Sequence, residues 1–220
     1  MARIVLFGTG QLADVVHFYL LYDSPHEVVA FTVDHEFMQS KEHLGLPVVP
    51  FEEVETRYPP DGFSMGIAAS YRKGNKLRAE KYFQSKRKGY QLINLVSSKA
   101  TTWPGLVIGD NCFVGEGSVI QPFAEIGSNV VLTGGTLVGH HTIIKDHCFT
   151  SANVAISGCV TIEPYCFVGL NATIRDNVTI ARECIIGAGA VILKDTKEKG
   201  VYVGRPAALL PTASDELSGF

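Results

Sequence analysis

The sequence of 220 residues predicts a small parallel α/β domain followed by a coil of short parallel strands, and three patterns support this fold class. In the first pattern, an aliphatic residue recurs at every sixth position from Ile108 to Ile192, with Thr150 as the one exception. A helix repeats about every 3.6 residues and a strand about every 2, so a period of six requires a different structure. A coil with three short strands per turn has this period, and three hexads then make one rung of a triangular prism.

In the second pattern, a small or medium side chain lies four positions after each of these aliphatic residues. Close packing inside a narrow prism requires small residues beside large ones. Cys112, Cys148, Cys166 and Cys184 fall at this position and are separated by whole rungs, so we expect them to stack as packing residues on one wall. Cys159 lies outside the row, and the pattern assigns neither it nor Thr150 a role. No CxxC pair is present, so a zinc ribbon is not supported.

The third pattern is an alternation of strand-like and helix-like segments before the coil. Strands are predicted at residues 3–7, 28–33, 46–49, 63–68 and 92–96, and helices at residues 13–21, 51–58 and 75–88. Such alternation is typical of a parallel sheet covered by helices. We therefore expect an α/β domain at residues 1–97, the coil at residues 98–208 and a C-terminal tail at residues 209–220.

The net charge and the distribution of apolar residues argue against several classes of protein. The net charge of -3 and the pI near 6.2 argue against nucleic acid as the main partner. The N-terminal apolar run ends at once in glycines, which is unlike a signal peptide, and no stretch reaches the roughly 20 apolar residues that span a bilayer. These features predict a cytoplasmic protein without a membrane partner.

A Gly8-x-Gly10-x-x-Ala13 sequence follows the first predicted strand and opens a helix. Glycines there let the backbone approach a phosphate, and Asp34 after the second strand is placed to accept a hydrogen bond from a ribose. The domain has about half the size that a dinucleotide requires, so a nucleoside diphosphate bearing another group fits better. The glycines could instead serve only a tight turn. Likewise, the basic residues Arg72, Lys73, Lys76 and Arg78 could face phosphates or solvent.

Two adjacent histidines, His140 and His141, follow Val138 at a predicted corner of the coil, where side chains point outward. An imidazole is a suitable general base at neutral pH. Gly158 lies one rung later and would leave space and a backbone N–H beside His140, which suits an oxyanion. Two surface histidines without a chemical role are the competing interpretation.

The hexapeptide coil, the α/β domain before it, Gly139-His140-His141 and the segment 203–207 together resemble sugar-nucleotide acetyltransferases of the left-handed β-helix superfamily. The similarity covers about residues 3–208. It is strongest to bacterial enzymes of glycan and lipopolysaccharide biosynthesis that N-acetylate nucleotide-linked 4-amino-4,6-dideoxysugars, and sialic acid O-acetyltransferases are similar too. The resemblance implies a small Rossmann-like domain followed by a left-handed parallel β-helix, and a homotrimer.

The resemblance also implies roles for particular residues. His140 corresponds to the catalytic base and Gly158 to the backbone donor that contacts the acetyl group. The implied contacts of acetyl-CoA are Gly158, Gly187, Gly204, Pro206 and Ala207. The implied contacts of the nucleotide sugar are Gly8, Thr9, Gly10, Gln11, Asp34, Arg78 and His141. No metal is implied.

The sequence departs from this family at one position. Several relatives have an acidic residue directly after the catalytic histidine, whereas this chain has His141. Either Asp146 or a carboxylate of a neighbouring chain then orients His140, or no carboxylate is needed.

We therefore expect an acetyl-CoA-dependent N-acetyltransferase that acts on a nucleotide-linked 4-amino-4,6-dideoxysugar, with direct attack by the amine. Three alternatives stay open: a sialic-acid-type O-acetyltransferase, a zinc enzyme like the γ-type carbonic anhydrases, and a coil without catalytic activity. The sequence leaves open whether the nucleotide is UDP, dTDP or GDP, which sugar carries the amine, and whether acyl groups other than acetyl are used.

Overall fold

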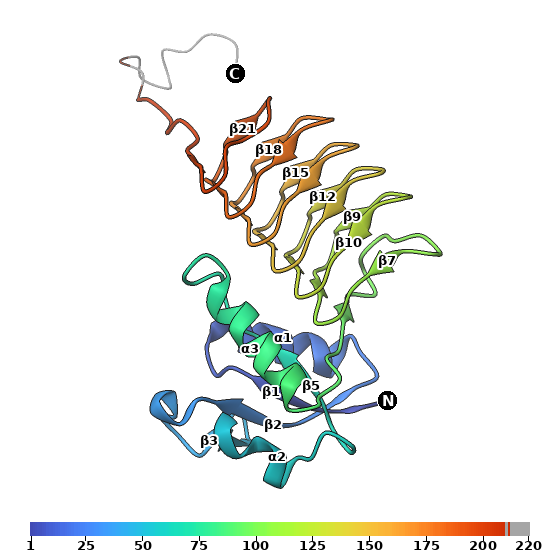
Figure 1. Cartoon of the computed structure of the whole chain (residues 1–220), viewed down its shortest axis with the longest axis vertical. Helices are drawn as coiled ribbons and strands as arrows, with labels where there is room; N and C mark the ends of the chain where they lie inside the picture. Colours follow the sequence, from blue (N-terminus) through green and yellow to red (C-terminus); the bar gives the residue numbers. More distant parts are fainter. Residues whose placement is uncertain (210, 212–220) are drawn as a thin grey trace.

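The structure is a computed structural model that describes residues 1–209 and 211. It consists of an N-terminal α/β domain and a coil of stacked rungs that rises from it (Figure 1). The predicted tail therefore lies almost entirely outside the described residues. Among the described residues, no helix has the length and apolar character needed to cross a membrane.

The N-terminal domain is a five-stranded sheet with helices on both faces. Its strands are β1 (Arg3–Phe7), β2 (Glu27–Val33), β3 (Glu42–His43), β4 (Leu46–Pro50) and β5 (Ser64–Ile67), in the order β3-β4-β2-β1-β5. The helices are α1 (Gln11–Tyr22), α2 (Val54–Arg57) and α3 (Lys76–Arg87), with short 3-10 turns η1 (His35–Phe37) and η2 (Phe51–Glu53). All pairs are parallel except β3–β4, a short antiparallel hairpin that the alternation of segments did not predict.

The two faces of this sheet have different surroundings. Alternate side chains of β1, such as Val5 and Phe7, pack toward Tyr82 of α3 on one face. Ile4 and Leu6 point to the other face and form a core with α1 that continues into Phe113 and Phe149 of the coil. The N-terminal domain and the coil therefore share a continuous hydrophobic core.

The coil has three walls of two-residue strands, as the hexad predicted. The first wall contains β7 (Val107–Ile108), β10 (Glu125–Ile126), β13 (Ile143–Ile144), β16 (Thr161–Ile162) and β19 (Thr179–Ile180). The second wall contains β6 (Leu95–Val96), β8 (Phe113–Val114), β11 (Val131–Leu132), β14 (Phe149–Thr150), β17 (Phe167–Val168), β20 (Ile185–Ile186) and β22 (Val201–Tyr202). The third wall contains β9 (Val119–Ile120), β12 (Leu137–Val138), β15 (Ala155–Ile156), β18 (Thr173–Ile174) and β21 (Val191–Ile192).

Every strand pairs in parallel with the strand one rung away, so Ile126 lies beside Ile108 and Ile144. The aliphatic residues of the hexad point inward and are buried, apart from the half-buried Ile108 of the first rung. This arrangement is a left-handed parallel β-helix, and the expected fold class is confirmed.

Each corner of the coil contains one residue in the left-handed backbone region, which glycine and asparagine adopt most easily. The corner between the second and third walls has only Gly117, Gly135, Asn153, Asn171 and Gly189 at this position. The corner between the first and second walls has Asn111, Asn129, His147, Tyr165 and Glu183, and we call it the covered corner because α3 packs on it. The corner between the third and first walls has Phe123, His141, Cys159 and Asn177, all exposed, and we call it the open corner.

The four cysteines of the hexad row are buried as predicted. Thr150, the exception in the aliphatic row, is also buried, and its hydroxyl lies 3.2 Å from that of Thr136. A second buried hydroxyl thus satisfies the polar group that Thr150 brings into the core.

Arg78 of α3 fastens the N-terminal domain to the covered corner. Its guanidinium is fully buried and donates to the carbonyls of Asn129, His147 and Cys148 at 2.9–3.2 Å. Beside it, the Asn111 amide donates to Asn129 and the Asn129 amide to Nδ1 of His147, so the side chains of this corner form a ladder. Burial lowers the pKa of Arg78 to about 10, so the guanidinium remains charged at neutral pH.

Candidate active site at the open corner

His140 projects from the turn between β12 and β13, directly before the left-handed residue His141. The backbone N–H of His140 donates to Oε1 of Gln121 at 2.9 Å, and its carbonyl accepts from the N–H of Cys159 at 2.8 Å. These bonds fix the backbone between the rung before and the rung after, while the imidazole itself is exposed. A rigid backbone with an exposed ring suits a group that must meet a substrate.

Gly158 lies directly against the imidazole of His140. A Cβ on residue 158 would stand 2.6 Å from Cε1 and 2.7 Å from Nε2 of His140, closer than atoms can approach. Only glycine therefore permits this position of the ring. Within the described part of the chain, the Gly158 N–H donates to no other protein group. A base and a free N–H donor are thus neighbours, as the spacing of one rung suggested.

His141 lies beside His140, with the two Nδ1 atoms 3.1 Å apart. At this distance one Nδ1 donates a proton to the other, which sets the tautomer of both rings. The ring of His141 also packs on Phe123, with centroids 4.8 Å apart.

Asp146, a candidate for orienting His140, is at the other corner. It precedes His147 at the covered corner, and its Oδ1 accepts from the N–H of Ser128 at 2.7 Å. Because successive hexads occupy successive corners, Asp146 cannot reach His140 within one chain. That expectation is wrong.

A cavity of about 400 Å³ opens next to the histidines. His141, Gln121 and Phe123 line one side, and Trp103 and Pro104 from the segment that leads into the coil line the other. No pattern in the sequence indicated this cavity, because Trp103 and Phe123 belong to no chemical motif.

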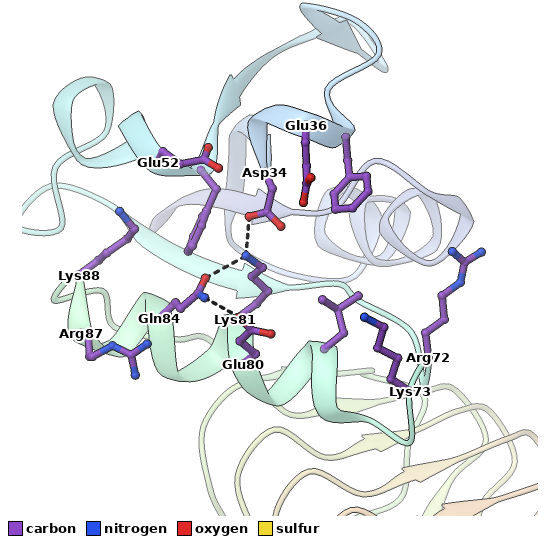
Figure 2. A pocket seen from close by; sticks show the side chains of 13 residues that line it. Asp34, Glu36, Glu52, Arg72, Lys73, Glu80, Lys81, Gln84, Arg87 and Lys88 are labelled. Atoms are coloured by element: carbon purple, nitrogen blue, oxygen red, sulfur yellow. Dashed lines mark hydrogen bonds and ion pairs between the residues drawn. The ribbon is translucent and has the colours of Figure 1, made fainter.

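A larger cavity, of about 890 Å³, lies in the N-terminal domain where β2 and β4 end (Figure 2). Asp34, directly after β2, and Glu52 of η2 face it from one side, and Lys81 and Gln84 of α3 face it from the other. Asp34 forms an ion pair of 2.5 Å with Lys81, whose Nζ also donates to Gln84. Phe37, which is 62% exposed, and the cations Arg72 and Lys73 lie at the same cavity.

The glycine turn at the end of β1 is next to this region but does not line the large cavity. The N–H of Gly8 donates to the carbonyl of Thr32, and a Cβ there would stand 2.8 Å from the carbonyl oxygen of Ala68. Gly10 is the N-cap of α1, which Gln11 begins, and Thr9 lines a smaller cavity of about 100 Å³. Gly8 therefore serves close packing of the chain, whereas Thr9 and Asp34 border cavities.

Arg78 was expected among the substrate-binding residues, but the structure places it elsewhere. It is fully buried, and three of its hydrogen bonds go to carbonyls of the coil. The amphipathic pattern of α3 identified a basic helix but not the surface that covers it. Arg78 is a structural residue.

The residues expected near acetyl-CoA lie at the end of the coil furthest from the N-terminal domain. The N–H of Gly187 donates to the carbonyl of Tyr202, and a Cβ on Gly204 would stand 2.5 Å from the carbonyl oxygen of Ala188. Pro206 and Ala207 follow β22 and are exposed. Gly187 and Gly204 thus lie at the corner between the second and third walls, which is a different corner from that of His140.

Two family models match the coil. Residues 105–140 match the bacterial transferase hexapeptide (six repeats), and residues 159–194 match the hexapeptide repeat of succinyl-transferase. No curated protein sequence matches the chain.

Solved structures match nearly the whole chain. A variant of perosamine N-acetyltransferase from Caulobacter crescentus, in which a histidine is replaced by asparagine, was solved with CoA and GDP-perosamine. It is 25% identical, with a TM-score of 0.84 over 96% of this chain and 98% of that chain. The acetyltransferase domain of PglB from Neisseria gonorrhoeae, with acetyl coenzyme A, is 22% identical, with a TM-score of 0.80 over 95% and 99%. WeeI from Acinetobacter baumannii is 20% identical, with a TM-score of 0.79 over 96% and 100%.

Proposed function

We propose that the chain is a hexapeptide-repeat sugar N-acetyltransferase that transfers the acetyl group of acetyl-CoA to the amino group of a nucleotide-linked 4-amino-4,6-dideoxysugar. The packing of His140 on Gly158 carries this proposal, because it pairs a proton acceptor with a free backbone donor. The similar enzyme from Caulobacter crescentus was solved with CoA and GDP-perosamine, a nucleotide-linked amino sugar.

The reaction is a direct transfer. The amine nitrogen attacks the thioester carbon of acetyl-CoA while His140 takes a proton from the nitrogen. The N–H of Gly158 stabilises the negative charge that develops on the carbonyl oxygen. Collapse of this intermediate breaks the carbon–sulfur bond, and the CoA thiolate leaves and takes up a proton. The balance requires no metal or acyl-enzyme.

His141 takes the place of the acidic residue that follows the base in several relatives. When Nε2 of His140 serves as the base, its proton resides on Nδ1 and is donated to Nδ1 of His141, 3.1 Å away. This hydrogen bond fixes the tautomer of His140, as a carboxylate would, but without a negative charge to stabilise the imidazolium. It assigns His141 a positioning role in addition to the substrate contact that the resemblance implies.

The large cavity of the N-terminal domain is the proposed nucleotide site. Phe37 offers a ring for the base, Arg72 and Lys73 offer charges for the diphosphate, and Asp34 lies at the end of β2 where a ribose is bound in such sheets. Binding energy gained there would orient an amine at the distant reacting centre.

The position of the open corner supports a homotrimer. The N-terminal domain packs on the second wall through Phe113 and Phe149, whereas His140 is at the apex opposite that wall. A nucleotide bound in one chain therefore lies on the far side of the prism from its own His140. A neighbouring subunit related by closed threefold symmetry would bring the two halves of the site together. Sedimentation of an active monomer would contradict this arrangement.

The test uses purified protein, acetyl-CoA and GDP-perosamine, with acetylated product measured by mass spectrometry. We expect His140→Asn to lower kcat by at least about 100-fold, since a general base contributes that much, while the Kd for the nucleotide stays unchanged. A variant that keeps near wild-type kcat would exclude His140 as the base.

Acetylation of a hydroxyl is the second candidate function, since the same base and donor could serve an alcohol. A panel of nucleotide sugars that differ only by an amine or a hydroxyl at one carbon separates the two. The N-acetyltransferase proposal predicts turnover of the amines alone.

A further inference from the structure

Three metal-ligating side chains meet at the open corner. One ring nitrogen from each of His140 and His141 and the sulfur of Cys159 all lie within 4.8 Å of one another. The two Nδ1 atoms are 3.1 Å apart. Of the five cysteines, Cys159 alone is exposed. The proposed acetyl transfer makes no use of this thiol.

The backbone holds these three side chains in place. His141 and Cys159 have left-handed φ values of 58° and 59° and occupy the same position in consecutive rungs. The N–H of Cys159 donates to the carbonyl of His140 at 2.8 Å, which ties the two turns together. A bulky residue in this backbone region is unfavourable, so cysteine here is not explained by turn preference. The ligands are therefore arranged before any ion arrives.

Two imidazole nitrogens and a thiolate are the ligands that Zn²⁺ and similar transition metals prefer. Tetrahedral zinc with bonds of about 2.0 Å to nitrogen places two nitrogens about 3.3 Å apart, close to the observed separation of the Nδ1 atoms. The Cys159 sulfur, within 4.8 Å of a nitrogen of each ring, is the third ligand.

We propose that His140, His141 and Cys159 bind a Zn²⁺ ion through both Nδ1 atoms and the thiolate, and that bound zinc inhibits the enzyme. Zinc replaces the proton shared by the two Nδ1 atoms, that proton moves to Nε2 of His140, and the thiol proton goes to solvent. Water fills the remaining tetrahedral position.

The inhibition follows from the chemistry of imidazole and rests on the proposed role of His140. A neutral ring with a metal on Nδ1 carries its proton on Nε2. Such a ring has no lone pair left for the amine proton, so the base is lost although the ring has hardly moved. Metal binding itself is independent of the proposed function.

The first measurement is binding, with tag-free protein under reducing, phosphate-free conditions. Titration with Co²⁺ is expected to give the near-ultraviolet charge-transfer band of a cobalt–thiolate bond, and Zn²⁺ is expected to abolish it. In Cys159→Ser the band is absent and Zn²⁺ binds at least about 100-fold more weakly, because the thiolate is lost. An equal Zn²⁺ affinity of the two proteins, or a band that persists in Cys159→Ser, would overturn the site.

The second measurement is activity, with product followed by mass spectrometry so that no thiol reagent is present. Wild type and Cys159→Ser are expected to have equal kcat without metal, and Zn²⁺ is expected to inhibit the wild type at its binding midpoint and the variant only at about 100-fold higher concentration. Mg²⁺ serves as the control ion. Zinc that binds as described yet leaves kcat unchanged would overturn the inhibition. If the wild type binds zinc as described but the metal-free protein transfers no acetyl group, the result counts against the proposed function alone.

Discussion

His141 and His147 occupy equivalent turn positions at neighbouring corners of the coil, with left-handed φ values of 58° and 64°. His147 is buried beneath Tyr82 and Phe83 of α3, with ring centroids 5.4 Å and 5.2 Å away. His141 is exposed and faces His140. The same residue type in the same backbone geometry is therefore structural at one corner and available for chemistry at the other.

The covered corner differs because α3 removes it from water. Burial lowers the pKa of His147 to about 4, against a weaker opposing effect of Asp146 and with the help of Arg78 and Arg182. Its Nδ1 accepts from the amide of Asn129, which requires a neutral ring. Thus the helix that packs on the coil, rather than the hexad itself, decides which corners can react.

The largest expected effect is the loss of stability in Arg78→Met, because this change removes the side chain that holds α3 on the covered corner. The change leaves the carbonyls of Asn129 and His147 without the Arg78 donor, whereas the Cys148 carbonyl keeps the N–H of Val131. Buried acceptors without partners cost about 1–3 kcal/mol each. We expect a loss of about 3 kcal/mol in the free energy of unfolding, measured with urea. Lys76→Met, which removes only the outer ion pair with Glu183, is the control and should cost less than about 1 kcal/mol. Equal stability of the two variants would contradict the fastening role of Arg78.

At the open corner, Gly158→Ala tests the chemistry rather than the fold. The new Cβ overlaps the imidazole of His140, which is exposed and can turn away, so stability should hardly change. We expect kcat to fall about 100-fold, the size of effect expected when a general base is moved out of place. In Gly62→Ala, the control, the new Cβ meets nothing closer than 3.9 Å, and kcat should equal that of wild type.

The pH dependence of stability tests the burial of His147. The unfolded chain binds a proton on His147 near its ordinary pKa of 6.5, whereas the folded chain does so only near 4. Stability is therefore complete above the unfolded value and falls as the pH decreases through this window, by about 2 kcal/mol between about pH 7 and pH 5. His147→Asn should remove this contribution from urea unfolding curves. If the slope of stability with pH is the same in both proteins, His147 is not the group responsible.

The smallest effect is expected from His141→Leu. Loss of the partner that fixes the tautomer of His140 should lower kcat by about tenfold, as losses of outer-shell partners do, with no change in unfolding. His141→Glu restores an acidic partner and should recover activity. Equal kcat values for the His141→Leu and His141→Glu variants would show that no orienting hydrogen bond is needed.

The sequence predicted the coil well because each of its rungs is held by local, repeated packing. The hexad located the walls, the corners and the stack of Cys112, Cys148, Cys166 and Cys184. It also placed His140 beside Gly158, since residues one rung apart must stack.

Prediction failed where contacts join distant segments. The basic pattern of α3 did not reveal that Arg78 would be buried against the coil, and Asp146 was assigned to the wrong corner. β3 has only two residues, too few to show periodicity, so its hairpin with β4 was not predicted. No pattern in the sequence assigned Cys159 a role, and only the fold shows that its sulfur lies near two histidines.

β6 is the link through which the N-terminal domain starts the coil. This strand directly follows the α/β domain, yet it forms the first ladder of the second wall by pairing with β8. Each later strand pairs only with strands of adjacent rungs. β6 therefore gives the second wall a partner at the end where the α/β domain lies, and the pairing scheme itself sets no maximum number of rungs. The stack ends where the sequence leaves the hexad, at β22 and the proline that follows it.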